Sequence, residues 1–210
     1  MYISQVEIDL NNRKKMKELS HLGVYHSWVE DSFPDEEGKR SRKLWRIDKI
    51  NGRKYLIIVS ENSPDINKLE KFGVKSTARF KSYDKYLSTI NQGDKMRFRV
   101  TLNPIVSRKE EISKRGRVYP LLNYYDQANF LLERSEKNGF KLKLEDFAIV
   151  ERKFVPLKKE GKKLVNLSKV TYEGLLTVTD KDLFYRSLTQ GFGKKKAYGC
   201  GLMTVIKVAD

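Results

Sequence analysis

The sequence predicts an α+β fold built from two successive βαββαβ units. Apolar and polar residues alternate over residues 6–10 and again over residues 98–102, and an asparagine ends each segment. Apolar residues at helical spacing follow in both halves. A strong turn dipeptide, Asn51-Gly52, joins two segments of strand type in the first half. This order of elements is the split βαβ pattern of a ferredoxin-like (RRM-like) domain.

The first half begins with a strand and then becomes helical. The alternation at residues 6–10 is typical of a strand with one buried face. Asn11 or Asn12 can cap a helix that starts near Arg13, and Ser20 opens a second helical stretch. The apolar stripe of this stretch consists of Tyr25, Trp28, Val29 and Phe33. Pro34 and Gly38 close the segment.

Two strands, a short helix and a last strand complete the first unit. The strands cover residues 44–48 and 55–59 on either side of Asn51-Gly52. Ser63-Pro64-Asp65 opens a helix that runs through Phe72 and stops at Gly73. We expect the fourth strand at residues 75–81.

The second half repeats this order. We expect strands at residues 95–102, 147–154, 165–178 and 202–208, and helices at residues 126–138 and 180–190. Residues 156–163 form a basic tip between two of these strands. We place the boundary near Gly93, which gives an N-terminal domain of residues 1–93 and a C-terminal domain of residues 94–210. The duplication suggested by the two similar strands rests on a short match.

The strongly basic composition indicates an anionic partner. The 210 residues include 43 Lys+Arg and 27 Asp+Glu, a formal net charge of +16. A positive charge of this size favours the binding of polyanions, and nucleic acid is the commonest polyanion in a cell. Residues 1–93 hold 18 basic and 13 acidic side chains, whereas residues 94–210 hold 25 and 14. We therefore expect most of the nucleic-acid surface in the second half; the alternative is a solvated, lysine-rich surface.

Cysteine and histidine are too scarce for a disulfide framework or a Cys/His zinc site. The chain has one cysteine, Cys200, and two histidines, His21 and His26. Acidic residues show no spacing typical of metal ligands, so we expect neither a metal nor a cofactor. The sequence has no apolar stretch of membrane-spanning length and no signal peptide at its start. We expect a cytoplasmic protein with no membrane partner.

A glycine-rich segment with three lysines lies between the last helix and the last strand. Gly191 and Gly193 precede the three lysines, and two further glycines follow them. The lysines are Lys194, Lys195 and Lys196. Glycine lets backbone N–H groups converge on an anion, and ammonium groups add charge where phosphates would pass. The segment lacks the Gly-Lys-Ser/Thr ending of a nucleotide P-loop. It predicts contact with phosphates; the alternative is a tight turn with solvated lysines.

Four segments together resemble the CasE family, the CRISPR RNA-processing endoribonucleases of Cascade. They are Tyr2-Ile3-Ser4-Gln5-Val6, Phe98-Arg99-Val100-Thr101-Leu102-Asn103-Pro104, Tyr172-Glu173-Gly174-Leu175-Leu176 and the glycine-rich end. The resemblance implies two ferredoxin-like domains that bind the CRISPR repeat hairpin and cut at the 3′ base of its stem without a metal. It also implies that the mature CRISPR RNA stays bound and that the other Cascade proteins are partners.

A histidine is the natural candidate for proton transfer, because its unperturbed pKa lies near neutrality. In a helix, His26 lies on the shoulder of the apolar stripe, where it can be held by packing and still reach a substrate. His21 points nearer the stripe or lies in a cap. The resemblance places the catalytic histidine at His26 and a tyrosine one turn earlier, where this chain has Gly23. Tyr25 is the nearest phenol and our second catalytic candidate; the alternative is an aromatic core residue.

Two further basic clusters are candidates for RNA binding. A-form RNA has a deep, narrow major groove, so recognition depends on phosphate spacing and backbone shape. A projecting basic hairpin suits that task, although each lysine has the alternative of being merely solvated. The candidates in the hairpin are Arg152, Lys153, Lys158, Lys159, Lys162 and Lys163. Those in the other cluster are Arg108, Arg115 and Arg117.

RNA carries its own nucleophile, which lets one histidine suffice for cleavage. The 2′-hydroxyl can attack the adjacent phosphate in line, so the protein must align groups, move protons and stabilise charge. The main hypothesis is a metal-independent endoribonuclease that matures CRISPR RNA. A non-catalytic RNA-binding subunit with the same fold and a general chaperone of structured RNA are the alternatives.

Overall fold

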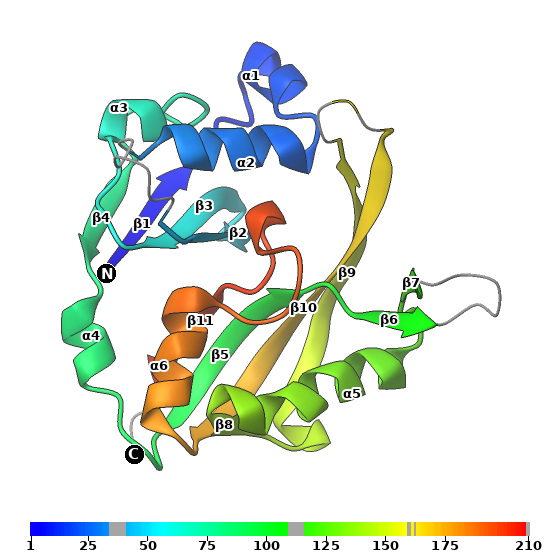
Figure 1. Ribbon diagram of the computed structural model, residues 1–210. Helices are drawn as coiled ribbons and strands as arrows, with labels where there is room; N and C mark the ends of the chain where they lie inside the picture. Colours follow the sequence, from blue (N-terminus) through cyan, green and yellow to red (C-terminus); the bar gives the residue numbers. More distant parts are fainter. Residues whose placement is uncertain (34–40, 109–115, 159–160, 162, 209–210) are drawn as a thin grey trace.

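The computed structural model describes residues 1–33, 41–108, 116–158, 161 and 163–208, and it contains two main antiparallel sheets with helices packed on them (Figure 1). The elements of the first half are β1 (Tyr2–Glu7), α1 (Arg13–Glu18), α2 (Leu22–Asp31), β2 (Lys43–Ile50), β3 (Arg53–Ser60), α3 (Ile66–Leu69), β4 (Arg79–Ser82) and α4 (Asp84–Ser88). Those of the second half are β5 (Lys95–Leu102), β6 (Ile105–Arg108), β7 (Arg117–Pro120), α5 (Tyr124–Ser135), η1 (Glu136–Asn138), β8 (Phe140–Lys141), η2 (Leu144–Asp146), β9 (Phe147–Leu157), β10 (Val165–Val178), α6 (Lys181–Gln190), η3 (Lys196–Tyr198) and β11 (Met203–Lys207).

The two sheets have the same strand order within their halves. The first sheet runs β2-β3-β1-β4, and the second runs β11-β5-β10, with β9 and then β8 paired along the other edge of β10. Every neighbouring pair is antiparallel. In each half, a connection that contains a helix joins two strands that are not neighbours, β1 to β2 and β5 to β9. The strands β3 and β10 lie between them. The predicted α+β fold with ferredoxin-like strand order is therefore confirmed.

Several element boundaries in the first half differ from the prediction. The hairpin of β2 and β3 turns at Asn51-Gly52 as predicted, and both residues have positive φ. The predicted helix at residues 65–72 contracts to α3, which Asp65 caps by accepting from the backbone N–H groups of Asn67 and Lys68. The predicted strand at residues 75–81 was placed too early. The carboxylate of Glu70 accepts from the Ala78 N–H at 3.1 Å, which holds this segment in a turn before β4 begins.

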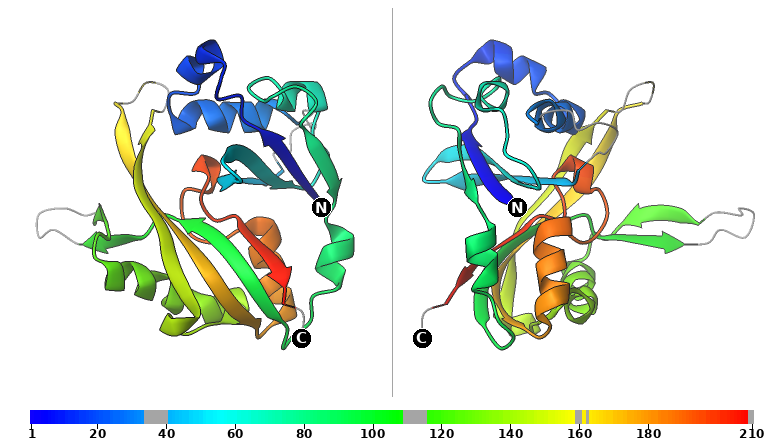
Figure 2. Two further views of the ribbon diagram at one scale, coloured as in Figure 1. Left: turned by 180° about the vertical axis from the view of Figure 1, so that it is seen from behind. Right: turned by 60° about the vertical axis from the view of Figure 1, so that its left-hand side comes forward.

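The second half contains elements that periodicity alone did not reveal. The strand β5 and the helix α6 lie where we expected them, and α5 begins two residues early. The short elements α4, β8 and the hairpin of β6 and β7 were not predicted from the sequence. This hairpin projects from the body of the molecule (Figure 2). Gly93 lies between α4 and β5 with φ of 91°, and the division into domains there remains a prediction.

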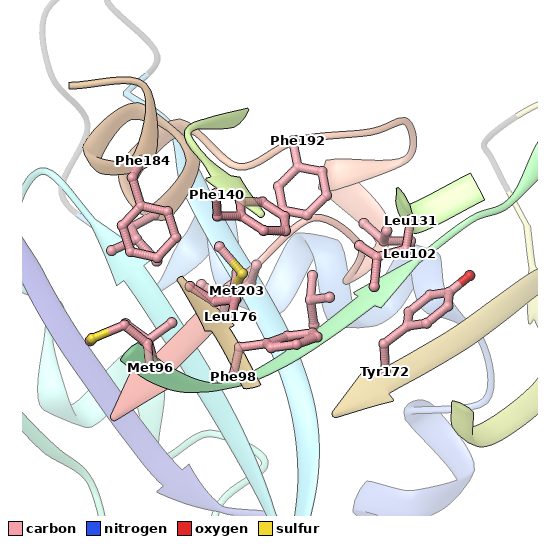
Figure 3. Close-up of a cluster of buried hydrophobic side chains, with 14 of the residues drawn as sticks. Met96, Phe98, Leu102, Leu131, Phe140, Tyr172, Leu176, Phe184, Phe192 and Met203 are labelled. Carbon is pink, nitrogen blue, oxygen red and sulfur yellow. The ribbon is translucent and has the colours of Figure 1, made fainter. Parts of the chain in front are cut away.

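Two hydrophobic clusters join the halves. Figure 3 shows the larger one, in which Phe98 and Met203 of the second sheet pack with Phe184 of α6 and Phe192. Leu44 and two other residues of the first sheet belong to the same cluster. The smaller cluster lies between α2 and the first sheet, and it includes Leu157, Leu167 and Cys200 from the second half. Each half therefore buries apolar surface that the other half supplies.

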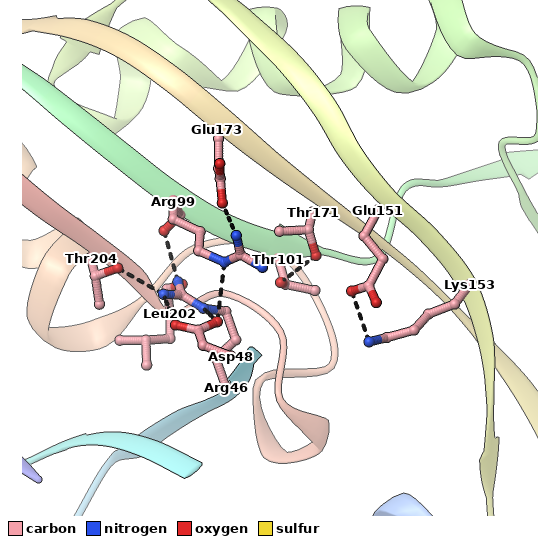
Figure 4. Close-up of polar contacts among 10 residues, drawn as sticks. All are labelled: Arg46, Asp48, Arg99, Thr101, Glu151, Lys153, Thr171, Glu173, Leu202 and Thr204. Carbon is pink, nitrogen blue, oxygen red and sulfur yellow. Dashed lines mark hydrogen bonds and ion pairs between the residues drawn. The ribbon is translucent and has the colours of Figure 1, made fainter. Parts of the chain in front are cut away.

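A buried arginine fixes the edge of the first sheet against the second (Figure 4). Arg46 on β2 is 2% exposed and donates to the carboxylate of Asp48 at 2.7 Å. It also donates to the carbonyl oxygens of Arg99 at 2.7 Å and Leu202 at 2.9 Å, and to the hydroxyl of Thr204 at 2.7 Å. Burial raises the pKa of Asp48, but the Arg46 and Arg99 guanidinium groups outweigh this effect and lower it. These contacts link β2 to β5 and β11.

Candidate functional site

His21 is the N-cap of α2. Its Nδ1 accepts a hydrogen bond from the backbone N–H of Gly23 at 3.1 Å, which satisfies one of the donors left unpaired at a helix start. The helix buries Trp28 and Val29 against the first sheet. The capping position is one of the two places that the sequence left open for this histidine. His21 therefore has a structural role at the beginning of the helix.

His26 lies on the same helix and is partly exposed, as its helical position predicted. Its side chain is 32% exposed, and its ring meets the Tyr198 ring edge to face, with centroids 5.6 Å apart. Within the described part of the chain, the Nδ1 atom is buried and has no hydrogen-bond partner. The Oε1 atom of Glu30 lies 3.8 Å away, too far for a hydrogen bond. Glu30 also pairs with Lys43 at 3.1 Å.

The glycine-rich segment forms a turn that packs against α2 and β2. Its four glycines, Gly191, Gly193, Gly199 and Gly201, all have positive φ. The Nζ atom of Lys196 donates to the carbonyl oxygens of Gln190 at 3.0 Å and Gly191 at 2.8 Å, where α6 ends, and burial lowers the pKa of Lys196. Lys194 and Lys195 are exposed. The three lysines therefore divide into one that holds the turn and two that face solvent.

Tyr25 belongs to an aromatic cluster beneath α2. Its ring stacks on Trp45 with centroids 6.0 Å apart and an interplanar angle of 18°, and it also meets Trp28 at 6.2 Å. Burial raises the pKa of the Tyr25 phenol, which disfavours the phenolate that a general base would need. The core placement was the alternative given by the sequence. The catalytic assignment of Tyr25 stays a prediction that this geometry does not support.

The basic hairpin of β9 and β10 reaches the start of α2 (Figure 1). The backbone carbonyl of Lys158 packs against Gly23, so the end of β9 lies beside the first turn of the helix. Lys158 and Lys163 are exposed, whereas Lys159 and Lys162 lie outside the described residues. The structure thus brings the hairpin and the helix that carries His26 into one region of the molecule.

Adjacent basic residues on β9 face in opposite directions, because successive side chains of a strand alternate. Arg152 donates to the backbone carbonyl of Leu122, next to α5. Lys153 pairs with Glu151 at 2.8 Å and lines a cavity of about 430 Å³ between α2 and the two sheets. Other basic residues also line this cavity: Arg46, Lys49, Lys54, Arg99 and Lys169. Arg152 and Lys153 therefore lie on opposite faces of β9, and their assignment to RNA binding stays a prediction.

The third basic cluster lies on the projecting hairpin of β6 and β7. Arg108 and Arg117 are directly paired across the two strands, and each guanidinium lies 5.9 Å from the ring centre of Tyr119. Arg115 is outside the described residues. The hairpin stands beside α5 rather than beside α2 (Figure 2). This places it apart from His26.

Sequence reasoning missed two residues: Tyr198, which contacts His26, and Lys169, which contacts the backbone of Tyr198. Tyr198 belongs to the glycine-rich segment, in which the clustered lysines indicate phosphate contact and a single tyrosine gives no such signal. Lys169 is 5% exposed in the middle of β10, and its Nζ donates to the carbonyl oxygen of Tyr198 at 3.1 Å. Burial lowers the pKa of Lys169. A lone lysine in a strand gives no sequence signal that it is buried.

A family of proteins described as "CRISPR associated protein" matches residues 1–207. The chain belongs to this family. The resemblance to the CasE family is thereby confirmed, and a curated relative, the "CRISPR-associated endoribonuclease Cse3" of Thermus thermophilus, is 25% identical over 98% of this chain and 99% of its own length. The "CRISPR system Cascade subunit CasE" of Escherichia coli K12 is 23% identical over 98% of both chains.

Solved structures share the fold of this CRISPR-associated protein. Thermus thermophilus Cse3 bound to an RNA that represents a pre-cleavage complex has a TM-score of 0.78, with 23% identity over 98% of each chain. The Escherichia coli Cas6e structure has a TM-score of 0.71, with 20% identity over 99% of this chain and 100% of Cas6e. In the described part of the chain, no helix is long and apolar enough to span a membrane. The described residues also contain no group of three or more His, Cys, Asp or Glu that could hold a metal ion.

Proposed function

We propose that this CRISPR-associated protein is an endoribonuclease that binds the repeat hairpin of precursor CRISPR RNA, cuts it at the 3′ base of the stem and retains the product as a Cascade subunit. The observation that carries the proposal is the partly exposed His26 on a helix whose first turn contacts the basic hairpin of β9 and β10. The names of the two relatives, an endoribonuclease and a Cascade subunit, support the same function.

The proposed reaction needs no metal because the substrate contains the nucleophile. The 2′-oxygen forms a bond to the adjacent phosphorus, and the bond from phosphorus to the 5′-oxygen breaks. The products are a 2′,3′-cyclic phosphate and a 5′-hydroxyl. One group takes the proton of the 2′-hydroxyl, and another gives a proton to the departing 5′-oxygen. His26 performs one of these transfers through Nε2, since its Nδ1 is buried.

Lysines supply the remaining electrostatic requirements. Lys194 and Lys195 are exposed on the turn that leads to Tyr198, which contacts His26. A cation near the scissile phosphate stabilises the charge that develops in the transition state. Lys158 and Lys163 extend from the hairpin and are suited to the phosphates of an A-form stem. RNA is thus bound largely through its backbone, and its shape aligns the scissile bond.

Cleavage of a synthetic repeat hairpin in EDTA tests this function. A second substrate carries a single 2′-deoxy nucleotide at the scissile position, and an unrelated hairpin of equal length measures specificity. We expect the first RNA alone to be cut, with a 2′,3′-cyclic phosphate end detected by mass spectrometry. Binding of the repeat hairpin without cleavage would instead assign a non-catalytic RNA-binding subunit. Equal binding of both hairpins would assign a general RNA chaperone.

A further inference from the structure

The turn at residues 196–198 delivers an aromatic ring from the second half to the histidine of the first helix. Tyr198 meets His26 at a centroid distance of 5.6 Å and an interplanar angle of 67°. This edge-to-face geometry is the favoured arrangement of two aromatic rings. The turn contacts both α2 and β2. The position of His26 is therefore set partly by a segment that lies far from it along the chain.

Two buried side chains hold the backbone of this turn in place. The indole Nε1 of Trp45 donates to the carbonyl oxygen of Ala197 at 3.2 Å. The Nζ atom of Lys169 donates to the carbonyl oxygen of Tyr198 at 3.1 Å and lies 5.5 Å from the ring centre of Trp45. Gly199 follows with φ of 72°, and a Cβ there would press on both Trp45 and Lys169. Tyr198 thus rests on a turn that has little freedom to move.

The imidazole of His26 needs such a constraint. A partly exposed histidine on a helix can adopt several rotamers, and an imidazole normally fixes its orientation by a hydrogen bond from one nitrogen. Among the described residues, the Nδ1 of His26 has no such bond, because Glu30 lies 3.8 Å away. We propose that Tyr198 is a positioning residue for His26, holding its imidazole so that Nε2 faces the RNA, and that Lys169 acts through Tyr198. This inference rests on the proposed function of His26.

The positioning role belongs to the aromatic ring of Tyr198 and not to its hydroxyl, and two substitutions distinguish these groups. Tyr198→Phe keeps the ring and should retain the single-turnover cleavage rate within about threefold, whereas Tyr198→Leu should lower it about tenfold because the edge-to-face contact is lost. The dissociation constant for uncleaved 2′-deoxy hairpin should change little in both variants. Tyr185→Leu, which removes an exposed tyrosine on α6, is the matched control. A Tyr198→Leu enzyme that cuts at the wild-type rate would overturn the proposal.

Lys169→Met provides a second and independent variant. Methionine fills similar space in the buried strand but cannot donate to the Tyr198 carbonyl, so the cleavage rate should fall severalfold. If Lys169 acts through Tyr198, the Tyr198→Leu and Lys169→Met effects should be strongly non-additive in the double variant. Fully additive effects would show that Lys169 acts by another route and would overturn its assigned role.

Nuclear Overhauser contacts between the two rings test the placement without any variant. We expect contacts between the His26 and Tyr198 rings in the wild-type protein, and ring-current shifts of the His26 signals that persist in Tyr198→Phe. Their absence in the folded wild-type protein would overturn the inference. His26→Ala distinguishes the two levels of proposal. If His26→Ala cuts normally, the proposed catalytic role fails; if it is inactive while Tyr198→Leu is fully active, the positioning role alone fails.

Discussion

The backbone carbonyl of Lys158 occupies the space that a side chain at position 23 would need. Gly23 has no Cβ, so the residue that follows β9 packs directly on the first turn of α2. The His21 ring also lies against this position, and its Nδ1 accepts from the Gly23 N–H. The tyrosine that the family resemblance implies at this position is incompatible with this packing. Gly23 therefore fixes the hairpin next to the helix that carries His26.

Gly23→Ala should destabilise the protein, although alanine normally favours a helix. In an open helix the change would add up to about 1 kcal/mol of stability. Here the new methyl group meets the Lys158 backbone, and overpacking of this kind costs about 1–3 kcal/mol. Urea denaturation measures the sign. Ser27→Ala on an exposed position of the same helix is the control, and a more stable Gly23→Ala protein would contradict the close packing.

His26→Ala should lower the single-turnover cleavage rate by about 10²-fold or more, because the variant loses one of the two proton transfers. Affinity for the 2′-deoxy hairpin should change little, since one imidazole adds little to binding beside many lysines. Quenched-flow or manual time courses at saturating protein give the rate, and filter binding gives the affinity.

His21→Ala serves as the comparison for this variant. It removes the N-cap of α2 and should cost about 0.5–2 kcal/mol of stability while leaving the cleavage rate near that of the wild type. An active His26→Ala together with a folded but inactive His21→Ala would reverse the assignment. Wild-type rates in both would remove histidine from the mechanism.

Substitution of four hairpin lysines should weaken RNA binding and reduce its dependence on salt. The variant changes Lys158, Lys159, Lys162 and Lys163 to alanine. Each phosphate contact that is lost should reduce the slope of log affinity against log salt by about 0.7–0.9. Equilibrium binding at several salt concentrations gives the slope. The control variant makes the same change in charge at four exposed lysines elsewhere, and it should keep the wild-type slope. These lysines are Lys85, Lys137, Lys141 and Lys181. An unchanged slope in the hairpin variant would exclude the hairpin from the interface.

The three lysines of the glycine-rich segment should differ in effect. Lys196→Ala removes two hydrogen bonds to the end of α6, so we expect a loss of about 1–2 kcal/mol in stability. Lys194→Ala and Lys195→Ala should leave stability unchanged and lower cleavage or binding. Thermal denaturation and cleavage assays of the three single variants separate these effects. If neither exposed lysine affects RNA, the segment is only a turn.

Asp48→Asn should destabilise the protein at neutral pH and much less in acid. The variant leaves Arg46 buried without its charged partner, which costs up to about 3–5 kcal/mol. The folded-state pKa of Asp48 is lowered, so its contribution is fully present above the unfolded pKa near 3.9 and is lost as pH falls through the folded pKa. Urea denaturation from pH 7 down to about pH 2 should show the wild type approaching the variant once the pH falls below about 4. A constant difference would contradict the pairing.

Local patterns in the sequence determined the elements and the fold class. The alternation in β5 and the turn at Asn51-Gly52 depend on residues next to one another, so they can be read from the chain. The helical position of His26 predicted its partial exposure for the same reason. Short elements such as β6 and β7 carry too few residues for a clear period, and they were missed.

The tertiary structure alone decided which side chains surround the histidine. The sequence identified the glycine-rich segment, but only the packing of the two halves brings Tyr198 to His26 and buries Lys169 against the Tyr198 carbonyl. In the same way, Arg152 and Lys153 are neighbours in sequence and lie on opposite faces of β9. Periodicity reports that a face is covered. It does not report what covers it, because that depends on contacts between segments that are distant in the chain.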